Sequence, residues 1–123
     1  PSCSAVCCMY AIKNAMLIKE KNPDTRVTIL YMDIRAYGKG YEEYYARAEQ
    51  LGVRFIRGMP GDIYAQDGTI IVQVENSETK DVLKIHADLV VLSVGIRPTG
   101  NASTLPNVLV SPAMNQDFLR VQM

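Results

Sequence analysis

The chain has 123 residues, enough for one domain that buries its own hydrophobic core without disulfides. Hydrophobic residues make up 48% and charged residues 21% of the sequence, and 13 basic side chains balance 13 acidic ones. This neutrality argues against a nucleic-acid surface or a polybasic membrane patch, and no apolar run approaches the roughly 20 residues that cross a bilayer.

The first predicted element is a helix from Ser4 to Lys21. Apolar and small residues recur there at spacings of three and four, and Ala, Met, Leu, Lys and Glu all favour helices. Ser2 or Ser4 is expected to cap its start. Asn22-Pro23 is expected to end it, because proline cannot continue a helix.

A strand and a second helix follow. The short apolar stretch from Arg26 to Met32 predicts a buried parallel strand that ends at Asp33. Tyr41 to Leu51 has helical spacing, and Gly52 supplies a C-terminal stop.

The next stretch is rich in short strands. Val53 to Arg57 predicts a strand that Gly58, Pro60 and Gly61 break. Alternation from Thr69 to Glu75 and from Val82 to His86, around a polar turn, predicts a hairpin or meander.

Beyond the hairpin, Asp88 to Val94 is apolar and predicts a buried strand ending at Gly95. Arg97 to Gly100 predicts a turn, and short strands are expected at Asn107 to Val110 and Phe118 to Gln122.

Helix–strand alternation predicts an α/β fold with right-handed crossovers and a parallel sheet. One strand ahead of Cys3 would complete a three-layer Rossmann-like module of the FAD/NAD(P)-binding type, with an antiparallel β-meander. The start at Pro1 and the strand-like end suggest that residues 1–123 are a single module, a fragment of a larger subunit, whose first strand is missing. The sheet edge left open predicts homodimer formation by strand pairing.

Three cysteines, Cys3, Cys7 and Cys8, lie within six positions at the start of the first helix. An odd, crowded set is no disulfide framework and indicates a reducing compartment and a metal centre. Iron–sulfur clusters need four ligands, normally thiolates, and a helix N-terminus stabilises their negative charge. The alternative is a trio of small buried hydrophobic residues; zinc is a weaker rival, because structural zinc sites prefer two separated ligand pairs.

Other residues allow two interpretations each. The cysteines stand where a dinucleotide-binding module has its glycine-rich loop, so Asp33, placed where a ribose-binding acid would sit, is better interpreted as a strand-end residue. Lys13 lies either on a solvated helix face or against a flavin. Gly95 either ends a plain strand or allows close approach of a cofactor. His86, the only histidine, is expected at the surface or a sheet edge.

The run Cys3-Ser-Ala-Val-Cys7-Cys8-Met-Tyr-Ala-Ile-Lys13-Asn-Ala resembles a signature of the family of heterodisulfide reductase A subunits. The stretches 29–42, 53–58 and 88–98 resemble later blocks of that family. The resemblance covers about the first hundred residues, and motif spacing this dense is specific.

The resemblance implies a cytoplasmic oxidoreductase subunit with a thioredoxin-reductase-like FAD core and 4Fe-4S clusters. Such a subunit passes electrons among partner heterodisulfide-reductase-type subunits, to the CoB-CoM heterodisulfide in methanogenesis. The resemblance makes Cys3, Cys7 and Cys8 three ligands of one cluster, whose fourth ligand lies outside this chain. It gives Lys13 a catalytic place against the flavin, and Gly95 a place in a cofactor-binding turn.

The FAD's own glycine-rich loop is not in this chain, so the chain by itself is expected to bind FAD weakly or not at all and to be inactive. Two other functions stay open: a degenerate nucleotide-binding-fold scaffold that packs against other domains without its own cofactor, and an NAD-binding domain that uses Asp33.

Overall fold

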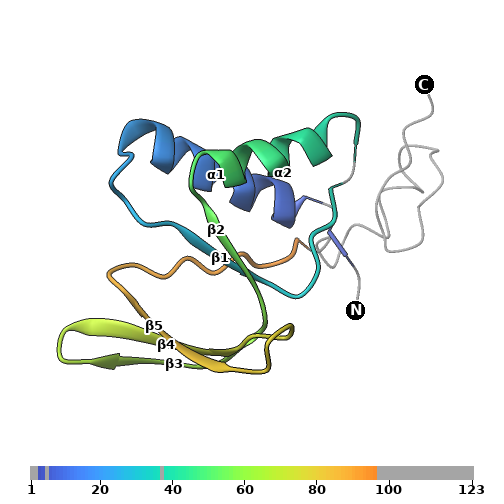
Figure 1. The fold of residues 1–123 in the computed structure, drawn as a ribbon. Helices are drawn as coiled ribbons and strands as arrows, with labels where there is room; N and C mark the ends of the chain where they lie inside the picture. The colour runs from blue at the N-terminus through green and yellow to red at the C-terminus, as the bar shows by residue number, and fades with distance from the viewer. Residues whose placement is uncertain (1–2, 5, 37, 97–123) are drawn as a thin grey trace, which may run out of the picture. The chain divides into compact units, whose positions relative to one another are not determined.

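The computed structural model describes residues 3, 4, 6–36 and 38–96 (Figure 1). The chain divides into two compact units, Ala5–Ser93 and a second that joins Pro1–Ser4 to Val94–Met123. The helices and strands of the described residues lie in the first unit, in the order α1 (Cys7–Lys21), β1 (Thr28–Tyr31), α2 (Tyr41–Gln50), β2 (Arg54–Arg57), β3 (Pro60–Gln66), β4 (Thr69–Glu75) and β5 (Val82–Ala87). The turn and strands expected beyond Ile96 lie outside the described residues.

Helix α1 confirms the predicted helix but not its predicted cap. Val6 is the N-cap residue and makes no side-chain cap hydrogen bond. Ser4 cannot cap the helix, because the first turn begins three residues later, at Cys7. The predicted stop is confirmed: the helix ends at Lys21, and the amide of Asn22 donates to the Ile18 carbonyl oxygen at 2.8 Å.

Strands β1 and β2 form the predicted parallel pair, with Ile29 opposite Phe55. Helices α1 and α2 cover one face of this pair and build the core, whose buried members are Met9, Ile12, Ala15, Met16, Ala48 and Val53. Val27, Ile29 and Phe55 pack against that core from the sheet. The expectation of a buried strand was wrong for β1, which is only half-buried along its whole length.

Strands β3, β4 and β5 form an antiparallel meander. The predicted hairpin of β4 and β5 is confirmed, and the Asn76 side-chain oxygen accepts hydrogen bonds from the amides of Glu78 and Thr79 in its turn. The predicted break after Arg57 is confirmed, because β2 ends there, but Pro60 and Gly61 do not lie in it, because β3 begins at Pro60. Proline is tolerated at the first residue of a strand, and the β3–β4 register shifts between Pro60 and Asp62.

The meander lies on the opposite side of β1 and β2 from the helices (Figure 1). The link between the two sheets is close at Gly58, where an added Cβ would come within 2.3 Å of the Glu75 carbonyl oxygen. The Ser77 amide also donates to the Arg57 carbonyl oxygen at 2.8 Å. The α/β class, with one parallel and one antiparallel sheet, is therefore confirmed within the Ala5–Ser93 unit.

The strand predicted at Asp88 to Val94 was wrong. These residues form no strand, and their apolar side chains are exposed, Val91 to 78%, except for the half-buried Val90. A strand needs a neighbouring edge for its backbone hydrogen bonds, and no strand of the described residues pairs with this segment. Among the described helices, none is long and apolar enough to cross a membrane.

Candidate functional site

Two of the three cysteines lie together in the first turn of α1. Cys7 and Cys8 are half-buried, and this turn holds no acidic residue, so nothing there neutralises the positive end of the helix dipole. The opposite end carries Lys19 and Lys21 in its last turn, the charge distribution that suits a helix dipole. The N-terminal end of α1 is therefore a favourable place for negative charge.

Two chain segments meet this turn. The Cys8 thiol lies 3.8 Å from the Asp33 carbonyl oxygen, just beyond the end of β1. The Ser93 hydroxyl donates to the Cys7 carbonyl oxygen at 3.3 Å. Cys7 and Cys8 thus contact two segments, the one that follows β1 and the one that follows β5.

Cys3 lies in the other unit, together with Ser4 and Gly95. Cys3 is half-buried. The Ser4 hydroxyl is buried and has no hydrogen-bond partner among the described residues. A Cβ added at Gly95 would lie 3.9 Å from that hydroxyl, so Gly95 passes close to the segment that carries Cys3.

The structure does not gather the three cysteines into a formed metal site. Across residues 3, 4, 6–36 and 38–96, no group of three or more His, Cys, Asp or Glu side chains is placed to hold a metal. The prediction that Cys3, Cys7 and Cys8 ligate one cluster therefore stays a prediction.

Lys13 lies about one and a half turns along α1 from the cysteines, and its side chain is exposed. It lines a largely apolar cavity of about 440 Å³ together with Val6, Met9, Tyr10, Tyr41 and Tyr44. The Lys13 ammonium group therefore lies beside aromatic and aliphatic side chains.

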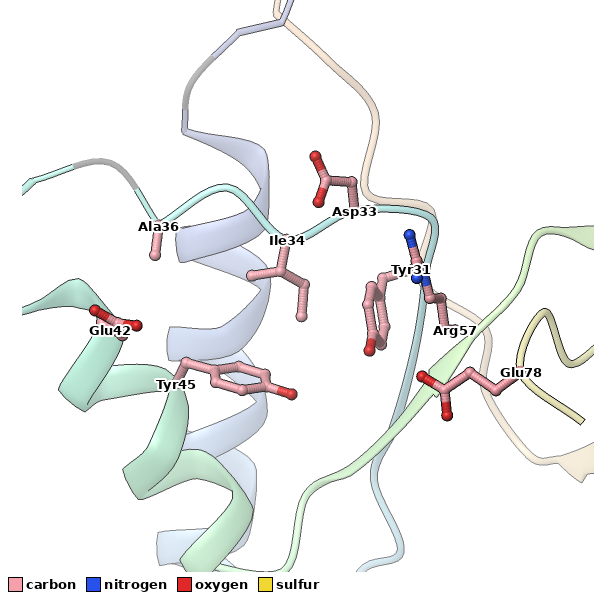
Figure 2. Close-up of a pocket in the computed structure, with 8 residues that line it drawn as sticks. All are labelled: Tyr31, Asp33, Ile34, Ala36, Glu42, Tyr45, Arg57 and Glu78. Atoms are coloured by element: carbon pink, nitrogen blue, oxygen red, sulfur yellow. The ribbon is translucent and has the colours of Figure 1, made fainter.

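A second cavity, of about 560 Å³, lies at the carboxyl ends of β1 and β2 (Figure 2). Its lining comprises Tyr31, Asp33, Ile34, Ala36, Glu42, Tyr45, Arg57 and Glu78. Ligands of parallel α/β sheets bind at this edge. Figure 2 shows the Tyr45 ring extending from α2 toward Tyr31, with Glu42 on one side of the cavity and Arg57 on the other.

The charges around this second cavity do not suit a phosphate. Three carboxylates, on Asp33, Glu42 and Glu78, face one guanidinium, on Arg57. Arg57 also donates to the Met32 carbonyl oxygen at 3.2 Å, and Asp33 already forms an exposed ion pair with Arg35 at 3.1 Å. The surroundings of Asp33 thus favour a neutral or cationic group over the pyrophosphate of a dinucleotide.

Tyr45 contributes a further polar group to the second cavity. Its hydroxyl donates to the Glu49 carboxylate at 3.3 Å. Partial burial, followed by the neighbouring charge of Glu49, raises the pKa of Tyr45 above its ordinary value. Tyr45 therefore stays a neutral hydrogen-bond donor throughout the physiological pH range.

Sequence reasoning placed Asp33 at a strand end but missed Arg57 and Glu78 beside it. One sequence signal could have found Arg57. Asp33 comes shortly after β1 and Arg57 ends β2, and the carboxyl ends of these parallel strands lie at the same edge of the sheet. Glu78 gave no such signal, because only the packing of the β4–β5 turn brings it there. His86 lies exposed on β5, as predicted.

Comparison with curated proteins finds close relatives. The chain is 53% identical over 112 residues to the second iron-sulfur A subunit of CoB–CoM heterodisulfide reductase in Methanopyrus kandleri, which is 89% of this chain and 17% of that protein. It is 53% identical over 110 residues to the corresponding protein of Methanocaldococcus jannaschii. It is 48% identical over 108 residues to the A subunit of ferredoxin:CoB–CoM heterodisulfide reductase in Methanosarcina mazei.

The match covers one segment of these relatives. The chain spans 14% to 17% of the length of the three proteins, while 87% to 89% of this chain is matched. No family model matches the chain.

Proposed function

Because this chain is similar to one segment of the heterodisulfide reductase A subunits, we propose that it forms an electron-transfer part of an oxidoreductase subunit of that kind. In this proposal Cys3, Cys7 and Cys8 are three ligands of a 4Fe-4S cluster, next to an FAD held largely by other parts of the polypeptide. When bound, these groups supply the one- and two-electron chemistry that side chains lack.

The observation that carries the proposal is the placement of Cys7 and Cys8 in the first turn of α1. Their half-buried thiols lie at a helix end without acidic neighbours in its first turn, where unpaired backbone N–H groups favour thiolates and a negatively charged cluster. The buried Ser4 hydroxyl, next to Cys3, finds no hydrogen-bond partner in the described part of the chain and could donate to a ligated sulfur.

The remaining site residues have supporting roles. Lys13 would place a positive charge beside the flavin ring, in the apolar cavity that it lines with Met9 and Tyr10. Gly95, which passes beside Ser4, keeps the backbone free of a side chain close to the cysteine segment. A Rossmann-like module of the FAD/NAD(P)-binding type is the proposed framework for both.

The names of the relatives supply the rest of the proposal. Following these names, we place this chain in a subunit of an enzyme that acts on a CoB–CoM heterodisulfide. We further propose that this subunit is cytoplasmic and passes electrons together with partner subunits. The 14% to 17% coverage of those relatives makes the activity a property of the longer polypeptide, so the chain by itself is expected to be inactive.

The test is the iron and acid-labile sulfide content of the parent polypeptide, purified without oxygen. We expect Cys7→Ser and Cys8→Ser each to remove roughly four irons per chain, the content of one such cluster, together with its visible absorption.

Val6→Ala is the matched control, because Val6 precedes Cys7 at the same helix end and its side chain is exposed. It should keep the full iron content. Unchanged iron content and an unchanged electron paramagnetic resonance signal in both cysteine variants would rule out the proposed ligands.

A further inference from the structure

The second cavity has an aromatic wall that the core of the protein holds in place. The Tyr45 ring packs edge-on against Phe55 at a centroid distance of 4.6 Å, and Tyr31 does so at 6.4 Å. Phe55 in turn packs against the hydrophobic core beneath α1 and α2. The two tyrosine rings are therefore ordered before any ligand arrives, and both line the cavity of about 560 Å³.

Negative charge reaches this cavity from three separate elements. Asp33 follows β1, Glu42 lies in the first turn of α2, and Glu78 lies in the turn between β4 and β5. Figure 2 shows the three carboxylates on different sides of the cavity. Asp33 pairs with Arg35, but neither Glu42 nor Glu78 forms an ion pair with any described residue.

The positive charge of the lining does not balance these carboxylates. Arg57 is the only basic residue among the described residues that line the cavity, and its Nε donates to the Met32 carbonyl oxygen at 3.2 Å. The lining therefore has an excess of negative charge beside its aromatic wall. A cation that enters the cavity lowers the repulsion among the carboxylates, whereas a phosphate raises it.

The aromatic wall selects among cations. A guanidinium group is planar and weakly hydrated, stacks on aromatic rings and pairs with carboxylates through two parallel hydrogen bonds. An ammonium group is compact and strongly hydrated, and it loses more hydration when it lies against a ring. Tyr31 and Tyr45, together with Glu42 and Glu78, thus suit a guanidinium better than an ammonium group.

The exposure of the carboxylates indicates where the guanidinium comes from. Asp33, Glu42 and Glu78 are all exposed to solvent. Exposed ion pairs are weak, so a free cation would be held loosely. An arginine on a protein surface brings further buried area around the same contact, which makes the ion pairs part of a larger interface.

We propose that the second cavity is a docking site for an arginine side chain of a partner subunit. Its guanidinium lies against the rings of Tyr31 and Tyr45 and pairs with the carboxylates of Glu42 and Glu78. The inference rests on the proposed function only for the existence of partner subunits. It requires neither a cluster nor a flavin, so its failure is distinguishable from a failure of the proposed function.

The first test is a titration of the 123-residue chain with ethylguanidinium, followed by nuclear magnetic resonance of labelled tyrosines. We expect saturable shifts of Tyr31 and Tyr45, with a dissociation constant on the order of 10 mM for so small a cation. Ethylurea has nearly the same shape without the charge and should bind at least about tenfold more weakly. Equal binding of the two compounds, or saturable binding of adenosine monophosphate at the same tyrosines, would overturn the proposal.

Neutral substitutions assign the binding to the carboxylates. Glu42→Gln and Glu78→Gln should each weaken ethylguanidinium binding roughly threefold, which is the effect of losing one exposed ion pair. Glu43→Gln is the matched control, because Glu43 lies beside Glu42 in the same turn of α2 but does not line the cavity. It should leave binding unchanged. Binding that survives both cavity substitutions in full would overturn the assignment of these carboxylates.

The second test distinguishes a partner's arginine from a free guanidinium compound. It uses the complex of the parent polypeptide with its partner subunits, whose assembly mass photometry measures. Glu42→Lys should raise the dissociation constant of this complex at least about tenfold, because it sets like charges against each other.

Glu43→Lys is the control for charge reversal, because it has the same cost at the N-terminal end of α2. It should leave assembly unchanged, and iron and flavin content should stay the same in both lysine variants. Unchanged assembly of the Glu42→Lys variant would overturn the docking of a partner's arginine. An equal loss in the two variants would overturn it as well, because the effect would then belong to the charge of α2 and not to the cavity.

Discussion

Among single residues, Lys13 connects the helix that carries the cysteines to a cavity. Its exposed side chain lines the apolar cavity with Met9 and Tyr10, on the stretch of α1 that follows Cys7 and Cys8. In the proposed function, its positive charge stabilises the anionic reduced form of the flavin more than the neutral oxidised form.

We therefore expect Lys13→Met to lower the flavin reduction potential in the parent polypeptide. The shift should be on the order of 30 mV, which corresponds to about 1.4 kcal/mol for a two-electron couple. Lys21→Met is the matched control, because Lys21 lies in the last turn of the same helix, and it should leave the potential unchanged. Spectroelectrochemical titration measures both, and equal potentials for the two variants would place the flavin away from Lys13.

Single residues were also where sequence reasoning was least complete. The spacing of Cys7 and Cys8 put them correctly at the helix start, and Asp33 correctly after a strand. Arg57 and Glu78 were missed because their approach to Asp33 depends on strand register and on a turn far along the chain, not on local pattern.

Among the elements, α1 shows most directly how sequence pattern becomes packing. Residues at helical spacing, Met9, Ile12, Ala15 and Met16, are buried, while Leu17 and Ile18 face solvent. Burial of this one face against α2 and the sheet is the main source of stability for a helix of this length.

Identical substitutions at Ile12 and Ile18 test whether burial of one face stabilises α1. Ile12 is 1% exposed and Ile18 is 42% exposed. Ile12→Ala should lower the free energy of unfolding by about 2–5 kcal/mol, because it removes buried methyl groups and leaves a cavity. Ile18→Ala should cost less than about 1 kcal/mol. Urea denaturation followed by circular dichroism measures both, and similar losses would show that the helix face is assigned incorrectly.

The close approach of the two sheets at Gly58 gives a second prediction about stability. A Cβ at Gly58 would lie 2.3 Å from the Glu75 carbonyl oxygen, whereas a Cβ at Gly61 meets nothing within 4 Å. Gly58→Ala should therefore destabilise the chain by at least about 1–3 kcal/mol, because backbone must move apart. Gly61→Ala should change stability by less than about 1 kcal/mol. Thermal unfolding of the two variants measures this difference. Equal stabilities of the two variants would show that Gly58 and Glu75 are not in close contact.

For the whole molecule, the described residues contain no complete group of side chains that could hold a metal. Cys7 and Cys8 lie in the Ala5–Ser93 unit and Cys3 in the other unit, and the relatives continue well beyond this segment. The N-terminal end of α2 carries Glu42 and Glu43, which repel phosphate. The N-terminal end of α2 is thus a poor place for the pyrophosphate of FAD, and the N-terminal end of α1 carries Cys7 and Cys8 instead of a glycine-rich loop.

The isolated chain should therefore bind FAD weakly. In a fluorescence titration we expect a dissociation constant above about 1 mM, equivalent to less than about 4 kcal/mol of binding free energy. The parent polypeptide, titrated after removal of its flavin, should bind FAD in a one-to-one ratio. Tight, saturable binding by the 123-residue chain would move the flavin site into this segment.

The sequence by itself determined the α/β class, both helices, the parallel pair and the β4–β5 hairpin, because these depend on local periodicity and on breakers such as Pro23 and Gly52. It also determined the likeness to the heterodisulfide reductase A subunits, because that likeness depends on dense motifs. Only the tertiary structure decided that β3 begins at Pro60, that Ser4 does not cap α1 and that Asp88–Ser93 stays unpaired. The physical reason is common to the two strand errors. Composition gives a segment the capacity to become a strand, but backbone hydrogen bonds form only where a neighbouring edge is present.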